Sequence, residues 1–128
     1  MIIIFPKEMI QAKTPKLILQ PIVENSIMHG FLGKKSHGSL RIRGLQKKDK
    51  MVITITDNGC GIPSEELRRI MAGERRKSYH GGGFGLRNID ERIKLAFGES
   101  YGLRVRSKYG IGTQVSIFLP LDERGELP

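Results

Sequence analysis

The chain of 128 residues contains a single cysteine, Cys60, so an internal disulfide is impossible and a cysteine-rich metal site is excluded. No apolar run approaches the roughly 18 residues that a membrane-spanning helix needs. The opening letters MIIIFP are too short for a secretory signal and lack both a basic start and a small-residue cleavage site. We therefore expect a cytoplasmic domain, with residues 1–128 forming one globular unit by size.

Acidic residues are scarce relative to basic ones, 13 against 22, and the formal net charge is +9. An excess of Lys and Arg attracts nucleic acid, acidic lipid headgroups and nucleotide phosphates. The basic residues are spread along the chain without the interleaved aromatic residues that stack on bases. This pattern favours a solvated basic surface, with no nucleic-acid partner expected, and a basic nucleic-acid-binding module is retained as an alternative.

Two familiar phosphate-binding loops are also missing. The dinucleotide motif G-x-G-x-x-G fails because Leu86 stands where a third glycine would follow Gly81 and Gly83, and the P-loop pattern occurs nowhere. What remains is a glycine-rich segment over 81–85 that leads into a predicted helix, whose free N–H groups favour an anion. Taken alone, such a segment is more typical of a surface hinge.

The spacing of apolar residues predicts helices and strands in the order α, β, β, α, α, β, β. The first helix is expected from Thr14 to Gly30, with a break or restart near Gln20 because Pro21 disfavours a helix interior. Further helices are expected from Pro63 and from Phe84 to Phe97, and a mobile loop over 73–83. The expected strands cover 40–42, 52–56, 103–107 and 114–119. The strands pair mainly through hairpins rather than alternating with helices. This order predicts an α+β fold, a two-layer sandwich whose mixed, mostly antiparallel sheet is covered on one face by helices.

Three further stretches combine polar groups with glycine. In "ENSIMHG" (24–30), Asn25 and His29 share a helical face that could hold a hard cation, or they form an ordinary polar face. In "DNGCGI" (57–62), Asp57 offers an acceptor carboxylate beside bare backbone, or it begins a tight turn. "GIGT" (110–113) enters a strand and is equally typical of a plain hairpin.

The order of the four motifs is more specific than any one of them. Reading "ENSIMHG", "DNGCGI", "GGGFGLRN" and "GIGT" in one chain, the sequence resembles the catalytic ATP-binding domain of sensor histidine kinases, of the Bergerat-type ATPase family. The phrases "PKLILQPIVENSIMHG" and "GFGLRNIDERIKLAFG" look most like the LytS/YesM-type kinases, and the likeness covers about 15–120. It implies the Bergerat fold, ATP and Mg²⁺ as cofactors, and transfer of the γ-phosphate to a histidine on a separate dimerisation domain.

The resemblance assigns roles to individual residues. It implies that Asn25 is the Mg²⁺ ligand and that Asp57 accepts the adenine amino hydrogen. It also implies that Gly59 and Gly61 lie beside the base, that Thr113 supports the adenine end, typically through water, and that His29 contacts the nucleotide. The residues implied to lie at the phosphates, beneath a closing lid, are Gly81, Gly83, Gly85 and Leu86. Two positions depart from the family pattern: Met28 replaces a phosphate-binding Lys, and Pro21 replaces an Asn or a water-activating Glu, which leaves Glu24 as the candidate catalytic base.

None of His29, His37 and His80 lies in the Asn-Pro-His-Phe-like context that the resemblance implies for a phosphoacceptor. We therefore expect a catalytic fragment that lacks its sensor and dimerisation domains and is inactive without its acceptor. The implied partners are the parent's own dimerisation domain and a response regulator, and the implied parent is a homodimer anchored in the membrane. A serine kinase of the anti-sigma-factor type, from the same ATPase family, is the second alternative.

Overall fold

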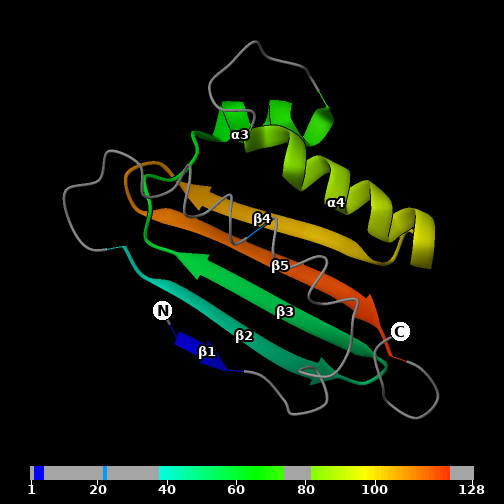
Figure 1. Ribbon diagram of the computed structural model, residues 1–128. Helices are drawn as coiled ribbons and strands as arrows, with labels where there is room; N and C mark the ends of the chain where they lie inside the picture. Colours follow the sequence, from blue (N-terminus) through cyan, green and yellow to red (C-terminus); the bar gives the residue numbers. More distant parts are fainter. Residues whose placement is uncertain (1, 5–21, 23–37, 74–81, 122–128) are drawn as a thin grey trace.

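The computed structural model describes residues 2–4, 22, 38–73 and 82–121, which form one five-stranded sheet and helices packed on it (Figure 1). The strand order is β1-β2-β3-β5-β4, with β1 parallel to β2 and the other neighbours antiparallel. The strands are β1 Ile2–Ile4, β2 Leu40–Lys47, β3 Lys50–Asp57, β4 Gly102–Lys108 and β5 Gly112–Pro120, and the helices are α3 Ser64–Ala72 and α4 Gly82–Phe97. The predicted mixed, mostly antiparallel α+β architecture is confirmed.

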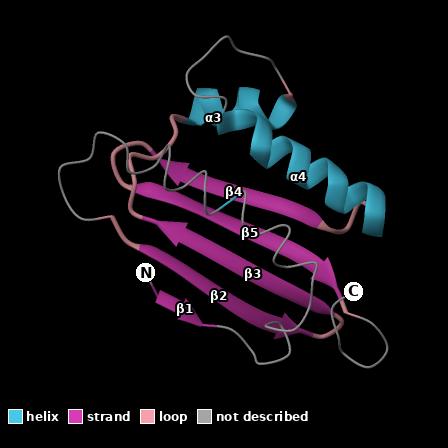
Figure 2. Cartoon of the chain, in the orientation of Figure 1, coloured by secondary structure: helices cyan, strands magenta, loops and turns pink. Residues whose placement is uncertain are grey.

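The core lies between one face of the sheet and the helices, which Figure 2 shows on a single side. Alternate residues of each long strand point into it, and Ile53 of β3 faces Ile117 of β5 with neither exposed to solvent. Helix α4 contributes every third or fourth residue. The buried apolar side chains are Ile22, Leu40, Ile42, Met51, Ile53, Ile55, Leu86, Ile89, Ile93, Val115, Ile117 and Leu119.

Two polar side chains of α4 hold the helix in place. The Oδ1 atom of Asp90 accepts hydrogen bonds from Lys94 Nζ at 2.6 Å and from the Leu103 N–H at 2.8 Å, which ties the helix to β4. Arg87 donates from Nη1 to the Met71 carbonyl at 2.6 Å, at the last turn of α3. No helix in the described part of the chain is long and apolar enough to cross a membrane.

The predicted boundaries need correction at three places. Helix α4 begins at Gly82, so the predicted loop over 73–83 extends too far and the helix was expected two residues late. The strands predicted over 40–42 and 52–56 are too short, because β2 continues to Lys47 and β3 begins at Lys50. The β2–β3 turn occupies only Lys48 and Asp49, with Lys48 at a φ of 53°. Strand β1 was not expected. The predicted helix over 14–30 lies outside the described residues except for Ile22, which is helical and buried.

Candidate functional site

The carboxyl of Asp57, the last residue of β3, is the one buried charged side chain among the described residues, at 8% exposure. Its Oδ1 accepts hydrogen bonds from the N–H of Gly59 at 2.9 Å and from the N–H of Thr113 at 3.2 Å. Thr113 stands directly opposite Asp57 in β5. Within the described ranges Oδ2 accepts no hydrogen bond, so two backbone donors fix the carboxyl while one oxygen stays available to a ligand N–H.

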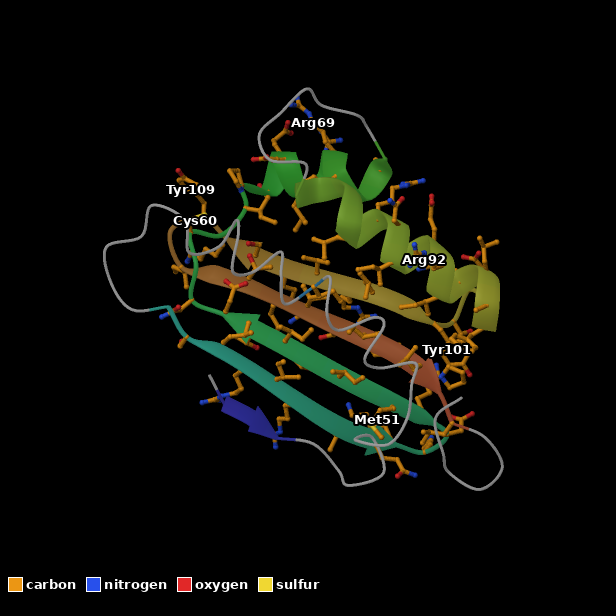
Figure 3. All side chains as sticks on the ribbon, in the orientation of Figure 1. Met51, Cys60, Arg69, Arg92, Tyr101 and Tyr109 are labelled. Atoms are coloured by element: carbon orange, nitrogen blue, oxygen red, sulfur yellow. The ribbon has the colours of Figure 1, made fainter. Side chains whose placement is uncertain are left out.

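Two glycines allow the loop after Asp57 to lie against the β4–β5 hairpin. Gly61 has a φ of +75°, and a methyl group there would overlap the Lys108 carbonyl oxygen and lie 2.7 Å from its carbon. A methyl at Gly112 would overlap the carbonyl oxygen of Asp57. Cys60 and Tyr109 mark the two neighbouring loops in Figure 3, and the Cys60 carbonyl accepts the Gly110 N–H at 2.6 Å. The bare backbone of Gly61 therefore makes room for the protein's own hairpin.

Ser107 of β4 joins these segments and was not among the predicted site residues. Its Oγ accepts the Ile62 N–H at 2.7 Å, lies 2.7 Å from the Thr113 hydroxyl, and donates to the Gly112 carbonyl at 3.0 Å. A serine hydroxyl carries one hydrogen, so donation to Gly112 requires that the Thr113 hydroxyl donate to Ser107. Thr113 Oγ1 then presents lone pairs beside the Asp57 carboxyl.

The length of the hairpin loop decides which residue faces Thr113. If residues 109–112 formed the whole connection between β4 and β5, Lys108 would lie opposite Thr113 and the two side chains would share one face of the sheet. In the structure Gly112 belongs to β5 and pairs with Lys108, so Ser107 is the cross-strand partner of Thr113. Because side chains alternate between the two faces of a sheet, this single-residue difference brings Ser107 to the site and turns Lys108 to the opposite face.

We expect Ser107→Ala to lower the free energy of unfolding by about 1 to 3 kcal/mol, because the Ile62 N–H loses its acceptor. Loosening the loop after Asp57 is also expected to weaken ligand binding about tenfold, which corresponds to about 1.4 kcal/mol. Urea unfolding and ligand titration measure the two effects. Ser116→Ala, a β5 substitution on the opposite sheet face, is the matched control, and equal losses in both variants would contradict the role of Ser107.

The remaining predicted residues fall into two groups. Leu86 lies in the core at 5% exposure, and Gly83 and Gly85 lie in the first turns of α4. Helix α3 has Glu65 and Glu66 in its first turn, whereas the first turn of α4 carries no acidic residue. The positive end of the α4 dipole is therefore not offset by an acidic side chain of that turn. The candidates that lie outside the described residues are Glu24, Asn25, His29 and Gly81, together with Pro21 and Met28. The described residues contain no cluster of metal-ligating side chains.

A helix-backed, mostly antiparallel sheet with a hydrogen-bonded carboxyl at the end of its central strand defines an α+β ligand-binding module. The residues present fit a planar base with an N–H donor, since Oδ2 of Asp57 is an unused acceptor beside the Thr113 hydroxyl. The chain belongs to the family of histidine kinase-, DNA gyrase B- and HSP90-like ATPases, whose model matches residues 11–123. Membership of this ATPase family implies that the ligand is ATP. The family resemblance predicted from the sequence is confirmed.

Curated relatives include sensor histidine kinases. The chain is 41% identical to the sensor histidine kinase YesM of Bacillus subtilis over 83% of its length, and 34% identical to the sensor protein LytS of Staphylococcus saprophyticus over 85%. It spans 17% and 18% of those two proteins. Among solved structures, the catalytic domain of histidine kinase ThkA matches with a TM-score of 0.60 at 18% identity, covering 82% of this chain and 63% of that one, which supports the fold.

Proposed function

We propose that the chain is the catalytic, ATP- and Mg²⁺-binding domain of a two-component sensor histidine kinase. The observation that carries the proposal is the Asp57 carboxyl, buried and held by two backbone N–H groups in a member of this ATPase family. The names of the relatives, sensor histidine kinases at 41% and 34% identity, support the kinase over a serine kinase of the anti-sigma-factor type. They also support it over a nucleic-acid-binding module.

In the proposed complex, Oδ2 of Asp57 accepts a hydrogen from the adenine amino group, and Thr113 Oγ1 supports the same end of the base. The phosphates would lie toward the N-terminus of α4, near Gly81, Gly83 and Gly85, because the free N–H groups of a first helical turn favour an anion. Asn25 would hold Mg²⁺ through its side-chain oxygen, and His29 would contact the nucleotide. Oxygen ligands together with substrate phosphates are the usual surroundings of Mg²⁺ in proteins.

The proposed reaction passes the γ-phosphoryl group to a histidine on the parent's dimerisation domain. The imidazole nitrogen attacks the γ-phosphorus, the bond to the bridging oxygen breaks, and ADP leaves with the electron pair; Glu24 is the candidate base for the imidazole proton. Such transfers depend mainly on positioning and charge neutralisation. The phosphohistidine then serves a response regulator. We place this domain in the cytoplasm of a homodimeric parent anchored in the membrane.

We expect Gly83→Val and Gly85→Val to weaken ATP binding at least about tenfold, because branched side chains obstruct the approach of phosphates to the α4 backbone. Titration with a fluorescent ATP analogue measures the affinity. Leu95→Val, at an exposed α4 position far from the helix N-terminus, is the control for placing a β-branched valine in this helix. Unchanged affinity in both glycine variants would contradict a role in phosphate binding.

Phosphotransfer tests the proposed function directly. ATP carrying a labelled γ-phosphate is mixed with this chain and with the parent's dimerisation domain as a separate protein. Acid-labile, base-stable label on that domain, dependent on Mg²⁺, is the expected result, because phosphohistidine is stable to base and phosphoserine is not. Acid-stable label on a partner serine would support the serine kinase instead, and the absence of ATP binding would overturn the proposal.

A further inference from the structure

The sheet face opposite the helices carries an ordered set of arginines. Strand register places four side chains in each of two rows that cross β2, β3, β5 and β4. Each row has an arginine at both ends and short polar side chains between them. The first row is Arg41, Thr56, Gln114 and Arg106, and the second is Arg43, Thr54, Ser116 and Arg104. All four arginines are exposed.

Among the residues that the structure describes, no acidic side chain offsets this charge. The acidic residues of the described ranges lie in the helices, in turns, or, for Asp57, on the core face. The ion pairs of the described residues join helix side chains, and none of them includes the four arginines. The only ring contact of the set places the Arg104 guanidinium 5.3 Å from the centre of the Phe118 ring. Clustered guanidinium groups of this kind attract an anionic partner.

We call the strip of sheet face between the arginines of β2 and those of β4 the trough, and the two arginine pairs its walls. Strands β2 and β4 are three strand spacings apart, so the backbones that carry the two pairs are about 14 Å apart. An α-helix with its side chains is about 10 to 12 Å wide, so one helix fits between the walls. The floor consists of short Thr and Ser side chains and Gln114. A flat surface such as a bilayer would meet only the arginine tips, whereas a helix reaches the floor as well.

The two ends of the trough differ. At one end, near the β4–β5 hairpin, a hollow of about 290 Å³ is lined by residues that include Thr56, Arg106, Lys108, Ile111 and Gln114. The lining of this hollow also includes Asp57, Ser107, Gly112 and Thr113, so this end of the trough adjoins the candidate ATP site. At the other end, Leu45, Val52 and Phe118 form a cross-strand apolar row in which Leu45 is 47% exposed.

We propose that this trough binds an acidic α-helix of a partner protein. Carboxylates along the two flanks of the helix pair with Arg41 and Arg43 on one wall and with Arg104 and Arg106 on the other. Guanidinium groups bind carboxylates through two parallel hydrogen bonds, which explains why arginine rather than lysine forms the walls. An apolar side chain of the helix packs beside Leu45. The four arginines lie on the sheet face opposite the Asp57 side chain, and the hairpin end of the trough adjoins the ATP site.

The test uses the whole chain and a fluorescein-labelled peptide of about 20 residues, long enough to form a helix, with Glu along both flanks and one Leu near an end. A second peptide of the same length and net charge has two central uncharged residues replaced by proline, which prevents a helix. Fluorescence anisotropy at physiological ionic strength is expected to show at least about tenfold tighter binding of the helical peptide. Equal binding of the two peptides would overturn the proposal, because it would reflect charge alone.

Charge reversals locate the binding surface. Arg43→Glu and Arg106→Glu are each expected to weaken peptide binding at least about tenfold. Arg92→Glu, the same change on the exposed side of α4, is expected to leave it unaltered (Figure 3). An unchanged urea midpoint of unfolding shows that each variant is folded, and the Gln variants at positions 43 and 106 repeat the test with a smaller change. Equal weakening by Arg92→Glu, or tighter binding to phosphatidylglycerol vesicles or single-stranded DNA than to the helical peptide, would refute an acidic helix as the occupant.

Discussion

Replacing Asp57 by Asn is expected to weaken ATP binding at least about 100-fold, or about 2.7 kcal/mol, while leaving the fold intact. The N–H groups of Gly59 and Thr113 both point at Oδ1, so the side-chain oxygen of the asparagine must stay at that position. Its NH₂ group then occupies the position of Oδ2 and meets the adenine amino group, donor against donor. Isothermal titration with a non-hydrolysable ATP analogue and Mg²⁺ measures the loss.

The same geometry predicts a change of base preference. Inosine triphosphate has a carbonyl oxygen where ATP has an amino group, so the Asp57→Asn variant should bind it more tightly than ATP, while the unaltered chain prefers ATP. Asp49→Asn in the exposed β2–β3 turn removes the same charge and serves as the control. Undiminished ATP affinity in Asp57→Asn would contradict the proposal that this carboxyl accepts the adenine amino hydrogen.

Gly61→Ala is expected to lower the free energy of unfolding by about 2 to 5 kcal/mol and to abolish ATP binding with it. The substitution forces a left-handed backbone on alanine and places a methyl group into the Lys108 carbonyl. The Lys108 carbonyl group cannot move away from this methyl group unless the β4–β5 hairpin moves, and that hairpin carries Ser107 and Thr113. Urea unfolding followed by circular dichroism gives the difference in stability.

Gly110→Ala separates the cost of the left-handed backbone from the cost of the overlap with the Lys108 carbonyl. Gly110 has a φ of +87°, close to that of Gly61, but a methyl group there meets nothing within 4 Å. It should therefore lose only the backbone preference, about 1 to 2 kcal/mol, and retain ATP binding. If the two variants unfolded at the same urea concentration, overlap with Lys108 would not be the reason for glycine at position 61.

Local pattern was sufficient to predict the elements that lie in the described ranges, except β1. Alternation of apolar residues identified β2, β3, β4 and β5, because each strand buries one face, and the 3.6-residue repeat identified α4. The first two residues of α4 were missed because both are glycines, which disfavour helices locally. Strand β1 was missed because its three residues carry too little pattern to distinguish a strand from any apolar segment.

The candidate site was likewise predictable from the sequence only in part. The order of four short motifs was enough to identify the ATPase family and to single out Asp57 and Thr113, since the motif residues are local in sequence. No local pattern shows that Thr113 donates its N–H to Asp57 across 56 positions, or that Ser107 joins the two. Those contacts follow from the pairing of β5 between β3 and β4, a non-sequential order set by packing of the whole sheet.

By itself, then, the sequence determined the elements, the family and the candidate ligand groups, because these depend on side-chain identity and spacing along the chain. Only the tertiary structure decided which atoms of those groups are already engaged and which are available, as with Oδ1 and Oδ2 of Asp57. It also decided that arginines from β2 and β4, far apart in sequence, stand in two facing walls. Register between strands is a property of long-range packing, and one residue of slip would send every one of these side chains to the other face.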